Sequence, residues 1–302
     1  MPISPELPPQ SPEEPLEKNV HESQEKAFNE EQIVGSVLDF EDPDHHKSTT
    51  VKIVGLNEVL GSGSVADWVA SVNVEIANED GSDQKTRTMV LKHYADHAYR
   101  SMEIIAQTMR VKHLSPLQES YENYQMLKGA GIATWKTFRI NEKKRVALMT
   151  LGADDGEVLR TTNDREYALR PRDQMLVEHP LTEIENRTEY LEEIRSILDK
   201  ADMLSLALSA DSWGTVFAPS EDPEKSGSYI LHALICDFDS LEKLPVSPIT
   251  KALFGRMVKK ATRKRNLDEL SAALFGIFLG ESEEKRALAD GIVKEIDPTF
   301  EW

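Results

Sequence analysis

Residues Ile230–Glu242, ILHALICDFDSLE, are the most informative stretch of this sequence. An apolar run, which we interpret as a buried strand, leads directly into Asp237-Phe238-Asp239. A carboxylate at the end of a buried strand can bind Mg²⁺, which prefers oxygen ligands and bridges phosphates. The alternative is an ordinary turn that ends the strand and leaves both aspartates exposed. The surrounding sequence has to decide between these two interpretations.

The elements around this stretch follow a definite order. Upstream, residues 51–76 read as two strands around Gly61-Ser62-Gly63, and 87–94 (RTMVLKHY) as a third strand that carries Lys92. Helical spacing follows over 97–128, with Ser115-Pro116 as a helix start, and then come two more strands. After Gly152 the pattern changes to a long helix over 183–209, the hairpin that contains the opening stretch, and further helices. The sequence therefore predicts an α+β protein whose strands come first.

This order resembles the protein-kinase-like superfamily, over residues about 51–245. The resemblance implies a bilobal fold, with a five-stranded antiparallel N-lobe sheet, one main helix and a small, mostly helical C-lobe. Residues 1–48 would be an acidic, Pro/Glu-rich disordered tail and turn. The N-lobe would span 49–152, and the C-lobe with the metal-site hairpin would span 153–302.

The resemblance also implies a site for ATP and Mg²⁺ between the two lobes. Gly61 and Gly63 match the first two glycines of a phosphate-covering loop, whose third glycine is Ala66 here. Lys92 matches the phosphate-binding lysine, and Glu122 matches the helix glutamate that pairs with the lysine. Asp237 matches the metal-binding aspartate of an Asp-Phe-Gly motif, whose glycine is Asp239 here. Glu119 is the competing choice for that glutamate, and Met149 and Leu151 would present backbone to adenine. Taken alone, the two glycines also suit a tight hairpin, and Lys92 also suits an exposed strand end.

The chain departs from this family where the catalytic loop is expected, in 204–217 (LSLALSADSWGTVF). The stretch holds no His-Arg-Asp and no asparagine, and Asp211 is its only acid. Asp211 could bind a metal in place of the asparagine, or it could be the catalytic base on a shortened loop. Two functions follow, an atypical phosphotransferase with an unknown acceptor and a pseudokinase or scaffold module. Transfer of AMP on the same fold and an unrelated α+β interaction protein also stay open.

Composition limits the possible partners. The 302 residues carry a net charge of −18, which opposes general nucleic-acid binding. The single cysteine, Cys236, excludes an intramolecular disulfide and a zinc site built from several cysteines. No apolar run reaches transmembrane length, and we expect a cytoplasmic protein. Basic residues gather in 256–265, where an acidic partner could dock, although the pattern favours a solvated helix face.

Overall fold

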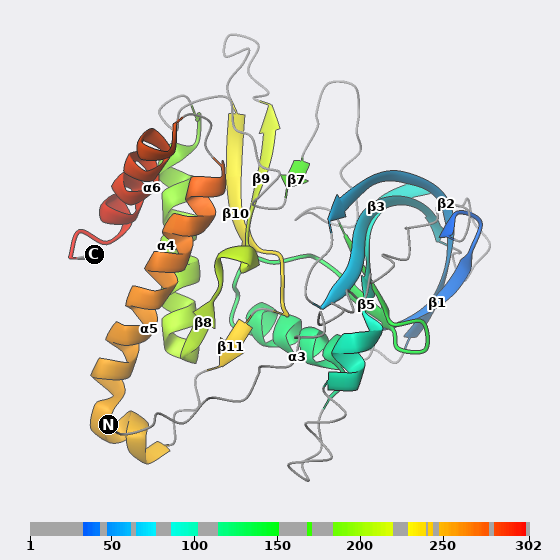
Figure 1. Ribbon diagram of the computed structural model, residues 1–302, viewed down its shortest axis with the longest axis horizontal. Helices are drawn as coiled ribbons and strands as arrows, with labels where there is room; N and C mark the ends of the chain where they lie inside the picture. The colour runs from blue at the N-terminus through cyan, green and yellow to red at the C-terminus, as the bar shows by residue number, and fades with distance from the viewer. Residues whose placement is uncertain are drawn as a thin grey trace, which may run out of the picture.

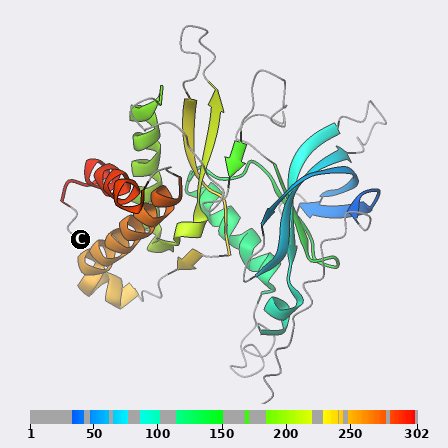
Figure 2. The ribbon, with the colours of Figure 1, turned by 45° about the horizontal axis from the view of Figure 1, so that its top comes forward.

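The computed structural model describes residues 33–42, 47–61, 65–76, 86–101, 114–150, 168–170, 184–219, 229–239, 241–243, 248–277 and 281–299. A sheet of strands lies on one side of the molecule and a layer of helices lies on the other (Figure 1). Helix α3 (Pro116–Gly129) and a second, smaller sheet lie between them, as the turned view also shows (Figure 2). The α+β class is therefore confirmed.

The larger sheet is a closed antiparallel barrel with the strand order β1-β2-β3-β4-β6-β5. Its strands are β1 (Val37–Asp42), β2 (Lys47–Gly61), β3 (Ala66–Ile76), β4 (Thr86–Tyr94), β5 (Phe138–Asn141) and β6 (Val146–Thr150). Successive side chains of a strand point to opposite faces. One face fills the barrel with fully buried residues such as Phe40, Val72, Leu91 and Leu148.

The expectation of a five-stranded sheet was wrong, because a sixth strand closes it. Strand β1 pairs with β2 from Val37↔Lys52 to Asp42↔Lys47, and it meets β5 at Glu41↔Ile140. The sequence VLDFED alternates, so that Phe40 enters the barrel core while the acidic residues on either side of it stay outside. The turn-forming residues that follow VLDFED in the sequence made this alternation hard to recognise as a strand. Burial of Phe40 and closure of the sheet edge explain why the strand forms.

The second part of the chain builds a small sheet and a layer of helices. Its strands are β7 (Ala168–Arg170), β9 (Trp213–Pro219) and β10 (Tyr229–Ile235), in the order β10-β9-β7. A separate pair joins β8 (Leu206–Leu208) to β11 (Leu241–Lys243). The helices are α4 (Arg187–Leu204), α5 (Pro248–Ile277) and α6 (Ser282–Ile296), and the short 3₁₀ helix η3 (Ala210–Ser212) precedes β9. The expected hairpin of 213–219 and the apolar run before Cys236 is confirmed.

Helix α3 begins where the sequence predicts it. Ser115 is the N-cap, its hydroxyl accepts a bond of 3.1 Å from the Gln118 N–H, and Pro116 occupies the first turn. The buried face of α3 is formed by Pro116, Leu117, Ser120, Tyr121, Tyr124 and Leu127. This face belongs to a core that also takes in the outward side chains of β4 and residues of β10, α4, α5 and α6. One continuous core therefore joins the barrel to the helical part.

None of the described helices is long and apolar enough to cross a membrane.

Candidate functional site at the Lys92–Asp237–Asp239 cluster

Strand β4 brings Lys92 to the junction of the two parts. Met89 and Leu91 point into the barrel, whereas Val90 and Tyr94 point outward and pack in the core shared with α3. Because the side chains of a strand alternate with a period of two, Lys92 lies on the same outward face as Val90 and Tyr94. Lys92 is only 9 % exposed, so its ammonium group must find partners inside the protein.

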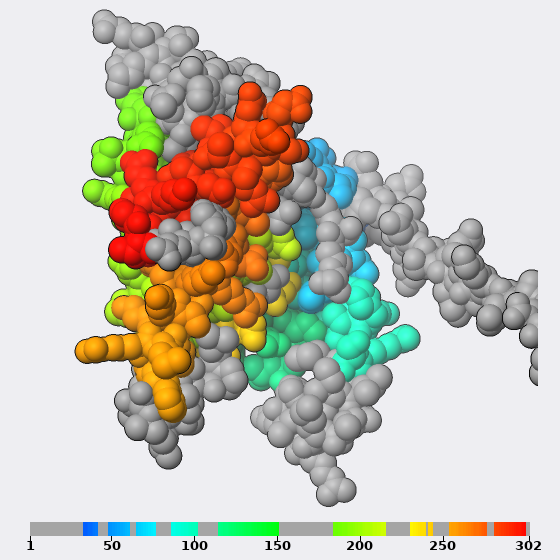
Figure 3. Space-filling view, turned by 60° about the vertical axis from the view of Figure 1, so that its left-hand side comes forward, coloured from blue at the N-terminus to red at the C-terminus, as the bar shows by residue number. Residues whose placement is uncertain are grey.

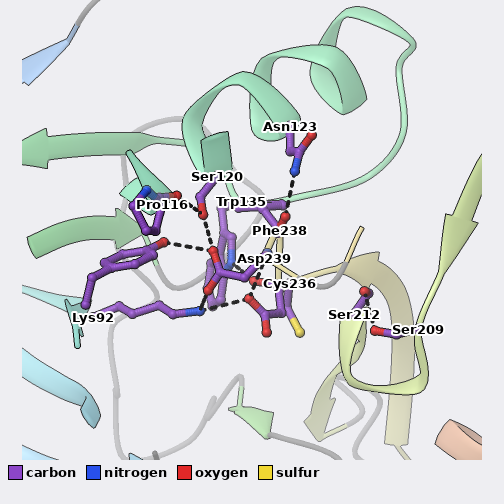
Figure 4. Close-up of polar contacts among 12 residues, drawn as sticks. Lys92, Pro116, Ser120, Asn123, Trp135, Ser209, Ser212, Cys236, Phe238 and Asp239 are labelled. Atoms are coloured by element: carbon purple, nitrogen blue, oxygen red, sulfur yellow. Dashed lines mark hydrogen bonds and ion pairs between the residues drawn. The ribbon is translucent and has the colours of Figure 1, made fainter. Parts of the chain in front are cut away.

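The turn that follows β10 is fixed by hydrogen bonds to its backbone. The Cys236 N–H donates to the Ser212 carbonyl at 2.8 Å, and the Trp135 indole donates to the Cys236 carbonyl at 2.7 Å. Two residues further along, the Phe238 carbonyl accepts a bond of 2.8 Å from the Asn123 amide on α3. These bonds come from three different segments. They leave the side chain of Asp239 aimed at Lys92 (Figure 4), and the Asp237 carboxylate contacts Lys92 as well.

Lys92 is held by two carboxylates at once. Its Nζ lies 2.8 Å from Asp237 Oδ1 and also forms an ion pair with Asp239. Asp239 accepts further bonds from the Tyr94 hydroxyl, at 3.2 Å, and from the Ser120 hydroxyl. The Asp239 side chain is 6 % exposed and that of Asp237 is 30 % exposed, so Asp237 is the carboxylate that faces solvent.

The pKa shifts describe a mutually stabilised ion cluster. Burial disfavours the charged amine of Lys92, but the two carboxylates outweigh it and raise the pKa of Lys92 well above its usual range. Burial alone would raise the pKa of Asp237, but Lys92 and the backbone N–H groups of the turn lower it overall. The pKa of Asp239 is raised, by burial first and by the neighbouring Asp237 charge, against the opposing effect of Lys92. The cluster therefore carries one positive and up to two negative charges.

Such a cluster provides oxygen ligands for a hard cation beside a lysine that can bind an anion. Among the described residues, no group of three or more histidine, cysteine, aspartate or glutamate side chains is arranged to hold a metal. A Mg²⁺ ion here would therefore depend on Asp237 and on oxygens from water and from a bound phosphate, which is an ordinary arrangement for Mg²⁺. The residues present therefore fit Mg²⁺ with Asp237 as the protein ligand.

Two of the expected site residues, Lys92 and Asp237, lie in contact in the structure, whereas Glu122 lies apart from them. Lys92 and Asp237 meet although 145 positions separate them in the chain. The expected pairing of Glu122 with Lys92 needs correction, because the carboxylates on Lys92 are those of Asp237 and Asp239. Both Glu122 and its competitor Glu119 lie on exposed positions of α3. The face of α3 that meets the cluster carries Ser120 and Asn123 instead.

The other expected residues are placed as follows. Asp211 is exposed in η3, next to Ser212, whose carbonyl binds the Cys236 N–H. Met149 is buried in β6, where it pairs with Val90 of β4 and Phe138 of β5. Gly61 ends β2 opposite Val69. Gly63 and Leu151 lie outside the described residues.

Sequence reasoning missed the roles of Asp239, Ser120, Tyr94 and Asn123. Asp239 was visible only as the residue that replaces the usual glycine after Asp-Phe. For Ser120 a signal existed, because it lies three residues after Leu117 and four before Tyr124, on the buried stripe of α3.

The basic cluster of 256–265 lies on α5, which forms one outer face of the molecule together with α6 (Figure 3). The Arg263 side chain is half-buried and forms ion pairs with Asp199 at 3.1 Å and with Asp202 at 3.3 Å. Arg265 pairs with Glu242 at 2.6 Å. The remaining basic residues of the cluster are exposed: Arg256, Lys259, Lys260 and Lys264. An acidic partner for them stays a prediction.

No protein-family model and no curated protein sequence matches this chain. Among solved structures, the chain is similar to Rio2 kinase from Chaetomium thermophilum, in a complex with ADP/Mg²⁺ and phosphoaspartate. The alignment covers 82 % of this chain and 73 % of that chain, with 13 % identity and a TM-score of 0.36. A likeness of this size carries no weight for the function, which has to be argued from the site itself.

Proposed function

We propose that the protein binds Mg·ATP at the Lys92–Asp237–Asp239 cluster and acts as an atypical kinase-like phosphotransferase, with an acceptor that is not yet identified. The observation that carries the proposal is the Lys92–Asp237 contact of 2.8 Å. It joins a strand of the antiparallel barrel to the end of a strand in the other part of the molecule. This order of elements matches the family that the sequence resembles.

In this proposal each residue has a separate task. Lys92 binds the anionic phosphates, while Asp237, the more exposed carboxylate, contacts the metal ion. When bound, Mg²⁺ would neutralise phosphate charge. Gly61 and Gly63 would cover the phosphates, and backbone near Met149 and Leu151 would meet the adenine. Asp211 would orient or deprotonate the acceptor, and positioning and charge neutralisation supply most of the catalysis in this reaction class.

The second candidate is a pseudokinase, a binding or scaffold module without efficient transfer. One observation favours it: Lys92 is already bound by two carboxylates, so phosphates would have to compete with them or share the lysine. A metal ion that draws Asp237 away from Lys92 would relieve this competition. This second candidate covers a pseudokinase with or without nucleotide binding, and in both forms it lacks efficient transfer.

A thermal-shift experiment with Mg·ATP tests the nucleotide site. At a ligand concentration of 100 Kd the folded state gains about 2.7 kcal/mol, which raises Tm by roughly 5–10 °C for a domain of this size. We expect this rise to need Mg²⁺ and to vanish in Asp237→Ala. Asp290→Ala is the matched control. The Asp290 carboxylate on α6 also accepts a side-chain hydrogen bond, at 2.9 Å from the Ser271 hydroxyl on α5. The Tm of this control variant should still rise with Mg·ATP.

A transfer assay with labelled ATP, run beside the thermal shift, separates the two candidates. No rise at millimolar Mg·ATP would overturn the nucleotide site. A rise with labelled phosphate on a protein or small-molecule acceptor supports the phosphotransferase. A rise without transfer to any acceptor, the chain itself included, supports the pseudokinase.

A further inference from the structure

The carboxylate of Asp239 is the point at which the barrel, α3 and the strand-ending turn meet. Lys92 and Tyr94 reach it from β4, and Ser120 reaches it from α3. With 6 % of its side chain exposed, it is the more enclosed of the two carboxylates on Lys92. Figure 4 shows Lys92 and Ser120 converging on the Asp239 carboxylate. An enclosed carboxylate with three partners is held in one orientation, because turning it would break several charge-assisted bonds.

Helix α3 also contacts the same turn through Asn123 and Tyr124. The Asn123 amide donates to the Phe238 carbonyl at 2.8 Å. The Phe238 ring, which is 2 % exposed, packs on Tyr124 with centroids 5.6 Å apart and on Phe138 at 5.4 Å. Asn123 and Tyr124 lie three and four residues after Ser120 and therefore share one face of the helix with it. The helix and the turn are thus coupled by two hydrogen bonds and an aromatic contact.

We propose that Asp239 is the positioning residue that couples α3 to Lys92, in the place where a helix glutamate was expected. The path runs from the Ser120 hydroxyl to the Asp239 carboxylate and from there to the Lys92 ammonium. A displacement of α3 withdraws the Ser120 bond and frees Asp239 to turn away from Lys92.

This coupling explains why Asp239 in place of the motif glycine occurs together with Ser120, rather than a glutamate, on the face of α3 that meets the cluster. A glycine at position 239 would leave Lys92 with Asp237 as its single carboxylate partner, and Asp237 is the group needed for the metal. Asp239 supplies a second carboxylate that keeps Lys92 oriented while Asp237 contacts the ion. The inference rests on the proposed nucleotide site for its functional meaning, whereas the coupling itself is a property of the free protein.

Ser120→Ala and Asp239→Asn test the coupling, with Ser271→Ala as the matched control. Ser271 is also buried and also donates to an aspartate, Asp290, at 2.9 Å, but it links α5 to α6. The first measurement is amide hydrogen exchange of the free protein over 236–243 and over α3. We expect faster exchange in both segments for Ser120→Ala and Asp239→Asn, and no change there for Ser271→Ala. Unchanged exchange in Ser120→Ala would overturn the coupling.

The second measurement is the Kd for Mg·ATP by titration calorimetry, in a double-mutant cycle. Loss of one hydrogen bond to a charged group would leave Lys92 oriented in about a tenth of the molecules, which predicts about tenfold weaker binding for Ser120→Ala. In the Asp239→Asn background the same serine change should add less than about twofold, because the path is already broken. Equal effects in both backgrounds would mean that Ser120 acts through general stability and would overturn the proposal.

The two measurements separate the two proposals. If the wild-type protein binds no nucleotide, the proposed function fails, while the exchange result still decides whether Asp239 couples α3 to Lys92. If nucleotide binds and Ser120→Ala has the same affinity and exchange as wild type, the proposed function stands and the coupling fails. Ser120→Ala retains the whole ion cluster, so the test remains available even if Asp239→Asn does not fold.

Discussion

Replacement of Lys92 by methionine is the most direct perturbation of the ion cluster. The change keeps most of the side-chain volume and removes the positive charge that lies 2.8 Å from Asp237 and also pairs with Asp239. Removing one partner of a buried ion pair typically costs about 3–5 kcal/mol, because the remaining charge is left without compensation. Two carboxylates are left here, so we expect a loss near the upper end. Since a domain is stable by about 5–15 kcal/mol, the loss is a large share of the total.

The loss must depend on pH. In the wild type the pKa of Asp237 is lowered, so its stabilising contribution is present above the unfolded value of about 3.9 and is lost as pH falls through the folded pKa. The pKa of Lys92 is raised, so its contribution is present below about 10.4 and is lost as pH rises through the folded pKa. Both contributions are therefore present at pH 5 and at pH 8. In the variant, the uncompensated carboxylates take up protons more readily, and the stability gap to wild type narrows as pH falls.

Urea unfolding of both proteins at pH 8 and pH 5 measures this gap. We expect a larger difference in unfolding free energy at pH 8 than at pH 5, with similar slopes. Lys264→Met is the control, because Lys264 is exposed on α5 and its replacement should change stability by less than about 0.5 kcal/mol. A loss below about 1 kcal/mol that is equal at both pH values is what an exposed ion pair gives. That result would refute the argument that Lys92 is a buried, doubly paired charge.

Three further predictions concern other parts of the fold. Burial raises the pKa of Asp202 to about 6 against the opposing effect of Arg263, so its ionisation costs the wild type stability progressively as pH rises from about 3.9 to about 6. In urea unfolding, the stability of Asp202→Asn relative to wild type should therefore rise by about 1.4 kcal/mol from pH 5 to pH 8. Burial, followed by the nearby Asp237 charge, raises the pKa of Cys236 to about 12. At pH 8 the Cys236 thiol of the folded protein should therefore react with a chromogenic disulfide on the order of 10³ more slowly than that of the urea-unfolded chain. Gly131 has a φ of +67°, and Gly131→Ala should cost about 1–2 kcal/mol, measured in the same unfolding assay.

Local patterns predicted those parts of the molecule that depend on neighbouring residues. The start of α3 follows from Ser115-Pro116, whose cap satisfies the free N–H groups of the first turn. The approach of Lys92 to Asp237 followed from the order of the strands rather than from either residue alone. The closure of the barrel by β1 could not be predicted, since it depends on pairing Glu41 with Ile140, across about a hundred residues.

The partner of Lys92 shows where sequence reasoning reaches its limit. Glu119, Ser120 and Glu122 all lie within one turn of α3, and the helix phase decides which of them meets the lysine. The apolar residues Leu117 and Tyr124 indicate which face of α3 points inward, and Glu122 lies outside that face. What the sequence could not supply was that a carboxylate from a distant turn, at Asp239, would fill the gap between Ser120 and Lys92.

This geometry predicts that a glutamate introduced at position 120 can replace the Asp239 carboxylate when position 239 is glycine. Asp239→Gly removes the buried carboxylate and should weaken both folding and Mg·ATP binding. Ser120→Glu alone should also be harmful, because it adds a second carboxylate beside Asp239. The double variant should recover much of both losses, since the glutamate introduced by Ser120→Glu would enter the space left by Asp239 and supply a carboxylate to Lys92 directly from α3. Unfolding free energies and Mg·ATP affinities of the four proteins form a complete cycle. Additive losses in the double variant would show that Asp239 does not stand in for a helix glutamate.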